Sequence, residues 1–359
     1  MRTSLYSVFI ITIFILVCMG GCEDKESDNK IKIGIILPLS GEVETYGKAV
    51  RRGLDIALQE NKKFEFIYED SKADERTAIN ALQKLLLSNI KYYIGDATSS
   101  VTYEIGPRIQ NENGILIVPI ATGDKIRDIG NNVFMISPRN EKQTKKIASF
   151  IMENYSNKYI GCFFKQNDYG VNIANTFVEL FYEKVYTQAY QDGQIDFRSS
   201  LENFRQKNVD LIFLPGNYQE NATILRQSKE INYNPIFIGT DGAYSPKLIS
   251  LAGEASEGFM LTMMPVNEET EFYKLFEEKY RNMYNNSPDI FACYGYESGT
   301  IMMNAIINNI NSSTEKICEY IRATEFNSLT GKLKFDSKGE AQRDYKIYIV
   351  KDGTFVSYK

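Results

Sequence analysis

Three hydroxyl residues in a row, Thr98, Ser99 and Ser100, follow an apolar run that ends at Gly95 and Asp96. This pattern is typical of a buried strand that ends where a helix begins, with serine and threonine at the helix start. The first N–H groups of a helix have no partners within it and carry the positive end of its dipole, so they can hold an anion. Helix capping alone is the commoner reason for such hydroxyls, and both interpretations stay open until the other loops are considered.

The elements that would position these hydroxyls alternate between short apolar runs and amphipathic segments. Such alternation predicts parallel sheets with crossover helices. The chain has two successive sets of predicted strands, KIKIGIILP, FEFIYED, KYYIGD and ILIVPIA, then YIGCFF, VDLIFLPG, PIFIGTDG and GFMLTMMP. We expect residues 269–321 to be almost wholly helical and the C-terminal end to form a small set of strands.

Polar loops follow the predicted strands. Ligands of open parallel sheets bind beyond the carboxyl ends of the strands. Tyr46, Tyr169, Tyr218 and Asp241 all lie in loops of this kind, as does the hydroxyl cluster. Asp241 in the sequence TDG also fits simple turn chemistry. The recurrence of hydroxyl, tyrosine and carboxylate groups after the strands nevertheless favours a binding site over capping alone.

The composition excludes several function classes. The 359 residues exceed one ordinary core and suit two lobes, and a net charge of −5 gives no reason to expect nucleic-acid binding. The chain has no histidine, which removes the usual general base and the commonest metal ligand. Cys162, Cys293 and Cys318 have no metal-like spacing, and Cys162 is interpreted as a buried thiol. We therefore expect no enzyme activity, no cofactor and no metal.

The N-terminus is typical of an exported lipoprotein. Residues 1–21 contain one arginine, a short hydrophobic stretch and small residues, which predicts a signal peptide. Met19, Gly20 and Gly21 before Cys22 resemble a bacterial lipobox, so Cys22 is the predicted lipidation site and residues 22–30 a polar tether. A retained transmembrane anchor is the alternative. Both interpretations place the body of the protein outside the cytoplasm.

Taken in order, the loops resemble those of the leucine/isoleucine/valine-binding family of ABC-transporter substrate-binding proteins. The resemblance begins at about Ile31 and runs through IGIILPLSGEVETYGKAVRRGLDIA, YYIGDATSSVT, NGILIVPIAT, KQNDYG, LRQSKE, GTDG, LAGEASEG and LTGKLKFDSKGE. It implies the type I periplasmic binding protein fold, an α/β fold in which two doubly wound parallel-sheet lobes joined by a three-segment hinge close around a small ligand. Lobe one would comprise residues 31–143 plus 265–343, and lobe two residues 144–264 plus 344–359.

The resemblance also implies site residues. Ser99 and Thr122 match the positions that hold an amino acid's carboxylate. Thr122, the backbone of Ile120 and the carboxylate of Asp241 match the ammonium site, where the family often has the longer Glu in place of Asp241. The positions that match the pocket wall are Tyr46, Tyr169, Tyr218 and Phe291.

The function implied is that of a lipid-anchored, extracytoplasmic receptor of an ABC importer. It would bind a branched-chain or related small amino acid, act as a monomer, and deliver the ligand to membrane permease and ATPase subunits. The alternative is an interaction or sensor lipoprotein that keeps the fold but regulates a partner protein. A filled or degenerate cleft would indicate that alternative.

Overall fold

Short apolar runs of the first third of the chain form a five-stranded, wholly parallel sheet. The computed structural model describes residues 30–182 and 184–358. The sheet has the strand order β2-β1-β3-β4-β5. Its strands are β1 (Ile31–Leu37), β2 (Phe64–Asp70), β3 (Tyr92–Gly95), β4 (Ile115–Val118) and β5 (Val133–Met135). The reversal of order at β1 and β3 places the ends of these two strands at a topological switch point, where such sheets bind ligands.

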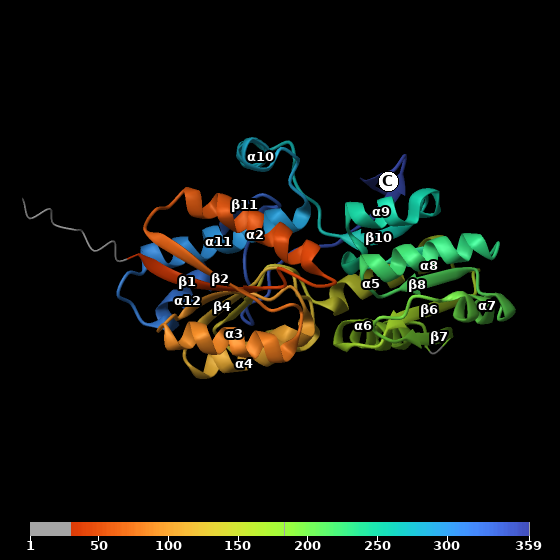
Figure 1. The fold of residues 1–359 in the computed structure, drawn as a ribbon, viewed down its shortest axis with the longest axis horizontal. Coiled ribbons are helices and arrows are strands. Elements are labelled where there is room, and N and C mark those ends of the chain that lie inside the picture. Colours follow the sequence, from red (N-terminus) through yellow and green to blue (C-terminus); the bar gives the residue numbers. More distant parts are fainter. Residues whose placement is uncertain (1–29, 183, 359) are drawn as a thin grey trace, which may run out of the picture.

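Helices cover both faces of this sheet (Figure 1). Along β1 successive side chains point to opposite faces, so Ile33 and Ile35 belong to one apolar cluster and Ile36 to another. The first cluster lies under α2 and α11, and the second under α3 and α4. The helices of this lobe are α2 (Glu44–Gln59), α3 (Glu75–Leu87), α4 (Ser99–Asn111), η1 (Asp124–Asp128), α10 (Glu271–Tyr284), α11 (Ile290–Asn308) and α12 (Thr314–Ala323).

Helices α2 and α11 approach each other at two glycines. A Cβ atom on Gly53 would lie 1.8 Å from the carbonyl oxygen of Ala292, and one on Gly295 would lie 2.1 Å from that of Val50. Both glycines are therefore required by close packing. Residues 269–321 are largely helical, as predicted, and this contact fixes α11 against the N-terminal part of the lobe.

The second sheet has seven strands in the order β14-β13-β10-β9-β8-β6-β7. Its core strands are parallel, and the C-terminal hairpin β13–β14 adds two antiparallel strands beside β10. The strands are β6 (Ile160–Lys165), β7 (Val185–Tyr190), β8 (Leu211–Leu214), β9 (Ile236–Gly239), β10 (Met260–Met263), β13 (Lys346–Lys351) and β14 (Thr354–Ser357). A separate two-stranded ladder joins β11 (Phe326–Ser328) to β12 (Gly331–Leu333).

The helices of the second lobe also lie on both faces of their sheet. Ile212 belongs to the cluster with residues of α7 and α8, whereas its neighbour Phe213 packs with residues of α5 and α6. The helical segments are α5 (Asn140–Asn154), α6 (Asp168–Leu180), α7 (Arg198–Gln206), α8 (Tyr218–Glu230), η2 (Asp241–Ala243), α9 (Pro246–Ala252) and η3 (Gly253–Ser256). Cys162, Cys293 and Cys318 are free and buried, which agrees with the interpretation of Cys162.

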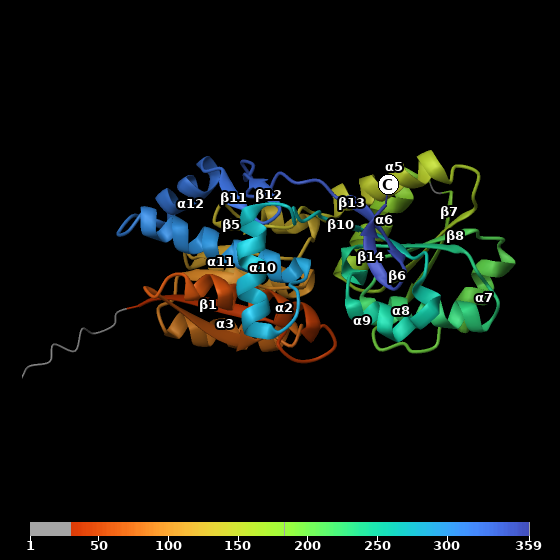
Figure 2. The ribbon, with the colours of Figure 1, turned by 90° about the horizontal axis from the view of Figure 1, so that it is seen from above.

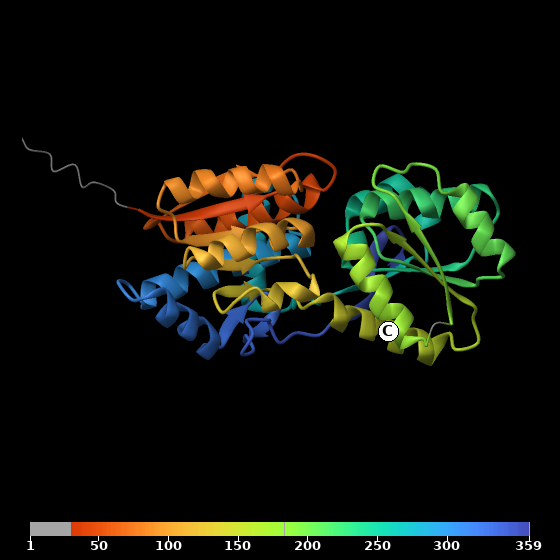
Figure 3. The same ribbon diagram turned by 90° about the horizontal axis from the view of Figure 1, so that it is seen from below.

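The α/β fold of two parallel-sheet lobes is confirmed. The chain passes between the sheets three times, between β5 and α5, between β10 and α10, and between β12 and β13 (Figures 2 and 3). The lobe boundaries expected at 143/144, 264/265 and 343/344 stay a prediction, and they fall in or beside these crossings. Strands β5 and β7 were not predicted, since β5 is only three residues long and β7 is a half-exposed edge strand.

The first and third crossings are joined by a buried carboxylate. Glu340 has a fully buried side chain, and Arg127, Arg139 and Lys142 place cationic groups 3.4, 3.3 and 2.9 Å from its oxygens. Tyr345 of the third crossing also donates a hydrogen bond to the carbonyl of Pro138 at 2.7 Å. These contacts hold the two crossings side by side.

Replacing Glu340 with Ala should destabilise the protein strongly. The change removes the buried carboxylate that Arg127, Arg139 and Lys142 share, and breaking a buried pair costs about 3 to 5 kcal/mol. Arg127 keeps Asp336 and Arg139 keeps Glu141 as ion-pair partners, so the loss should lie at the lower end of this range. Urea unfolding should show this loss of free energy of unfolding. The control is Glu254→Ala, because the side chain of Glu254 is 93% exposed and its one ion pair among the described residues is with Lys229. Equal stability of the two variants would contradict a structural role for Glu340.

Candidate ligand-binding site

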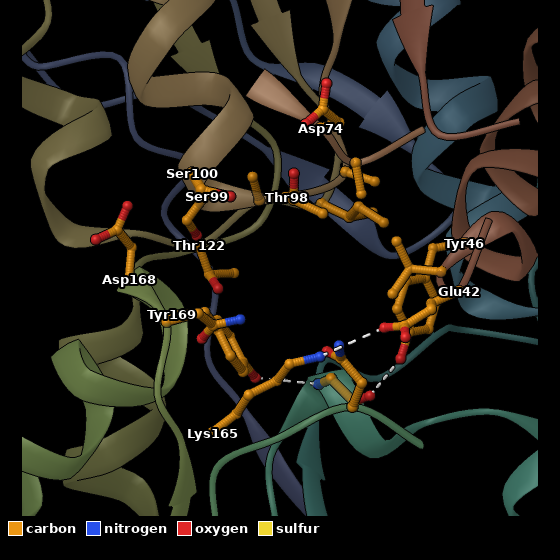
Figure 4. Close-up of a pocket in the computed structure, with 18 of the residues that line it drawn as sticks. Glu42, Tyr46, Asp74, Thr98, Ser99, Ser100, Thr122, Lys165, Asp168 and Tyr169 are labelled. Carbon is orange, nitrogen blue, oxygen red and sulfur yellow. Dashed lines mark hydrogen bonds and ion pairs between the residues drawn. The ribbon is translucent and has the colours of Figure 1, made fainter. Parts of the chain in front are cut away.

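A cavity of about 570 Å³ lies between the two lobes. Its wall is built from the segments that follow β1, β2, β3 and β4 in one lobe and β6, β7, β8 and β9 in the other, together with Phe291 of α11. Figure 4 shows Ser99 and Thr122 on one side of it and Glu42, Tyr46 and Lys165 across from them. Seven of the eight predicted site residues line this cavity: Tyr46, Ser99, Ile120, Thr122, Tyr169, Asp241 and Phe291.

The N-terminus of α4 faces this cavity without a side-chain cap. Thr98 occupies the N-cap position, but its hydroxyl donates to Asp96 Oδ1 at 2.9 Å and accepts no hydrogen bond from the N–H groups of the helix, so the capping interpretation is wrong in this detail. The Ser99 side chain is almost fully buried, and its hydroxyl has no hydrogen-bond partner among the described residues. This uncapped helix start, with an unpaired hydroxyl beside it, is suited to bind an anion.

Asp96 holds the loop before α4 in place. This buried carboxylate accepts hydrogen bonds from the Ser71 hydroxyl at 2.6 Å and from the Thr98 backbone N–H at 2.8 Å. Burial raises the pKa of Asp96 to about 6, and these hydrogen bonds act in the opposite direction. Asp96 therefore positions the helix start from behind and does not itself line the cavity.

Ile120 and Thr122 lie on the loop after β4. Both side chains are buried and both residues line the cavity. The carbonyl oxygen of Thr122 accepts a hydrogen bond from the backbone N–H of Asn140 at 2.7 Å. Since Asn140 begins α5 of the second lobe, this bond links the site directly to the first crossing segment.

Asp241 brings a carboxylate to the cavity from the second lobe. It lies just after β9, and its Oδ1 accepts hydrogen bonds from the Tyr169 hydroxyl at 2.6 Å and from the Gly242 N–H at 3.0 Å. Burial raises the pKa of Asp241, and the hydrogen bond from Tyr169 lowers it. A nearby cation would stabilise the charged form of this carboxylate further.

Tyr46 crosses from the first lobe to the second. Its hydroxyl donates to the carbonyl oxygen of Gly242 at 2.5 Å. Its ring packs edge-on against the rings of Phe291 and Tyr218, with centroid distances of 5.3 and 5.6 Å. Tyr218 is not among the residues that line the cavity, and its predicted role in the pocket wall stays a prediction. Its ring supports Tyr46 from behind, and its hydroxyl lies 3.1 Å from that of Thr45.

The sequence interpretation missed a charged cluster in the cavity wall. Lys165 is buried at the end of β6, with its Nζ 2.5 Å from Asp192, 2.6 Å from Glu220 and 3.7 Å from Glu42 of the other lobe. The three carboxylates lie close enough together to share a cation, and the ammonium of Lys165 contacts each of them. Lys165 and Glu42 both follow predicted strands, and this position is the signal from which the sequence could have identified them as residues of the cavity wall.

Two hinged α/β lobes with a polar cavity between them define a solute-binding protein. The chain belongs to the periplasmic binding protein family, whose profile matches residues 30–354. The leucine-, isoleucine-, valine-, threonine- and alanine-binding protein of Pseudomonas aeruginosa is 25% identical over 332 residues, 89% of each chain. The Leu/Ile/Val-binding protein of Citrobacter freundii is 23% identical over 325 residues, 86% of this chain and 88% of that protein.

Solved structures agree with this assignment. The leucine-binding protein LivK of Thermotoga maritima has a TM-score of 0.87 at 26% identity, over 92% of this chain and 98% of LivK. A solute-binding protein of R. palustris in complex with benzoate has a TM-score of 0.83 at 18% identity, over 91% of this chain and 95% of that one, and shows the shared fold alone. The predicted family is confirmed, and the chain is a binding protein and not an enzyme.

The periplasmic assignment agrees with the predicted location outside the cytoplasm. The predicted signal peptide, Cys22 and the tether as far as residue 29 lie outside the described residues. Among the residues that are described, none of the helices has both the length and the apolar character needed to cross a membrane.

Replacing Asp96 with Asn should remove part of the pH dependence of stability. From about pH 4 to about pH 6 the folded protein keeps the Asp96 proton that the unfolded chain has lost, because burial raises the pKa in the folded state. This carboxyl should therefore lower the free energy of unfolding, by up to about 3 kcal/mol, as the pH rises through that range. Urea unfolding of both proteins measures the difference, and parallel pH profiles would contradict it.

Proposed function

We propose that this chain is the extracytoplasmic receptor of an ABC importer and that its ligand is an α-amino acid. The observation that carries the proposal is the pairing of opposite poles across one cavity. Ser99 and the start of α4 offer hydrogen-bond donors from the first lobe, and Asp241 offers a carboxylate from the second. A zwitterion would satisfy both at once, because its carboxylate suits the donors and its ammonium suits Asp241.

The cavity and the relatives support this ligand class. A volume of about 570 Å³ is in the usual range for small-molecule sites. Tyr46 and Phe291 supply apolar ring surface for the aliphatic part of a side chain. Relatives over most of the chain are named for binding leucine, isoleucine and valine, so branched-chain and related small amino acids are the first candidates.

Delivery to a transporter follows from closure of the lobes. A ligand that touches Ser99 of one lobe and Asp241 of the other binds the closed arrangement better than an open one, and so favours closure. In this proposal membrane permease and ATPase subunits recognise the closed form, and a lipid on Cys22 keeps the receptor near them. The receptor acts as a monomer. An interaction or sensor role with a filled cleft has less support, because the cleft contains a cavity lined by polar groups.

Ser99→Ala and Asp241→Asn should each weaken amino-acid binding by about 1 to 3 kcal/mol, because each removes one charge-assisted hydrogen bond. Isothermal titration of residues 24–359 with leucine, isoleucine, valine and the other amino acids measures this. Ser250→Ala is the control, since its exposed hydroxyl only donates to a carbonyl of its own helix. Failure of every amino acid to bind would refute the proposal, and unchanged affinity in both variants would refute the site.

Binding of an amino acid should weaken as the pH falls through the raised pKa of Asp241. The ammonium needs the ionised carboxylate, and burial makes Asp241 take up a proton at a higher pH than an ordinary aspartate does. Titrations of leucine at decreasing pH should show this loss, whereas Asp241→Asn should lack it. Equal pH profiles for the two proteins would show that the ammonium does not lie at Asp241.

A further inference from the structure

The cavity wall is strongly acidic. Among the described residues that line it, six carry carboxylates and two carry ammonium groups, which leaves four net negative charges. The acidic residues are Glu42, Asp74, Glu75, Asp168, Asp192 and Asp241, and the basic ones are Lys72 and Lys165. An α-amino acid with an uncharged side chain would bring one ammonium to Asp241 and leave the rest of this charge unpaired.

Lys165 does not cancel the charge at its end of the cavity. Its ammonium already contacts Asp192 and Glu220 at 2.5 and 2.6 Å, and Glu42 at 3.7 Å. One cation is therefore shared by three carboxylates. The second oxygen of Glu220 is buried and has no hydrogen-bond partner in the described part of the chain. This end of the cavity thus has acceptors in excess and no free ammonium donor to offer a ligand.

Glu42 and Asp192 are the accessible carboxylates of this cluster. Their side chains are 61% and 71% exposed, and they belong to different lobes. Figure 4 shows Glu42 next to Tyr46, with the ammonium of Lys165 directed at its carboxylate. A side chain whose aliphatic part lies along Tyr46 would therefore bring its far end to a place flanked by carboxylates from both lobes.

Acidic groups of the two lobes also lie near each other at another part of the wall. Glu75 comes from the first lobe and Asp168 from the second, and the charge of Asp168 acts on Glu75. The pKa of Glu75 is raised by burial first, then by the charges of Glu104 and Asp168. Like charges that approach on closure oppose it, so a positively charged ligand would favour closure more than a neutral one would.

We propose that the ligand is an amino acid with a cationic side chain, and that Glu42 and Asp192 recognise its ammonium or guanidinium group. This inference rests on the proposed function, since it assumes that Ser99 and Asp241 hold the α-carboxylate and α-ammonium. Tyr46 and Phe291 then contact the aliphatic stem, as aromatic faces commonly do for lysine and arginine. An anionic side chain would have to displace a carboxylate from Lys165, and an aliphatic one would cover charges without pairing them.

The test is isothermal titration of the soluble body with lysine, arginine, leucine and glutamate. Lysine or arginine should bind at least about tenfold more tightly than leucine, with glutamate weakest. Raising the salt concentration from about 50 to about 500 mM should weaken binding of the cationic ligands more than that of leucine, because the recognising carboxylates are exposed. Leucine binding as tightly as lysine, or glutamate binding more tightly, would overturn the inference.

Variants separate this inference from the proposed function. Glu42→Gln and Asp192→Asn should each weaken lysine binding about three- to tenfold and change leucine binding less than about twofold. Both side chains are largely exposed, so the fold should tolerate the changes. Glu254→Gln, an exposed carboxylate outside the cavity, should change neither affinity.

The two failures look different. If Glu42→Gln and Asp192→Asn leave lysine affinity unchanged while Ser99→Ala lowers it, the side-chain assignment is wrong and the amino-acid receptor stands. If none of the amino acids binds, both the proposed function and the assignment of a cationic side chain are wrong.

Discussion

The structure depends on polar groups of opposite character that face one cavity from separate lobes. The Ser99 hydroxyl is buried and has no hydrogen-bond partner among the described residues. It lies at the start of α4, which has no side-chain cap among these residues. Asp241 is a buried carboxylate whose pKa burial raises. The Ser99 hydroxyl is costly to bury without a hydrogen-bond partner. Asp241 accepts hydrogen bonds from Tyr169 and Gly242, and a nearby cation would further stabilise its buried charge. In the proposed function, a bound zwitterion supplies an acceptor for the Ser99 hydroxyl and a cation for Asp241, and it thereby stabilises the closed structure.

The fold brings these groups together by simple means. Both come directly after parallel strands, β3 and β9, whose carboxyl ends face the space between the sheets. The rest of the site depends on buried supports. Asp96 holds the loop before α4, Tyr169 orients the carboxylate of Asp241, and Glu340 joins two crossing segments. These supports explain how a site assembled from distant parts of the chain can be precise.

The sequence predicted the parts whose pattern is local. Fully buried strands such as β4 and β8 appear as unbroken apolar runs. The polar loops after the strands indicated a site, and the family resemblance assigned Ser99, Thr122 and Asp241 to it. The half-exposed edge strand β7 lacks such a run, and β5 is too short for one. The position of Tyr218 after β8 does not reveal that its ring packs against Tyr46. The meeting of Glu42 with Lys165 and Asp192 depends on lobe packing, since no local pattern joins residues so far apart in the chain.

In this fold, the side chains that line the cavity determine which ligand binds, and the shared arrangement of strands and helices does not. The R. palustris protein solved with benzoate shares the fold of this chain, whereas other relatives are named for binding leucine, isoleucine and valine, which differ from benzoate in shape and in charge. One fold can bind such different ligands because the strands determine where the loops are attached, while the side chains on the loops are free to differ. In this chain the loops place six carboxylates and two lysines around the cavity. Charges at such a site act on the ligand and on closure together, since each lobe carries part of them. In the inference proposed above, the same acidic wall rejects an anion and favours closure around a cation.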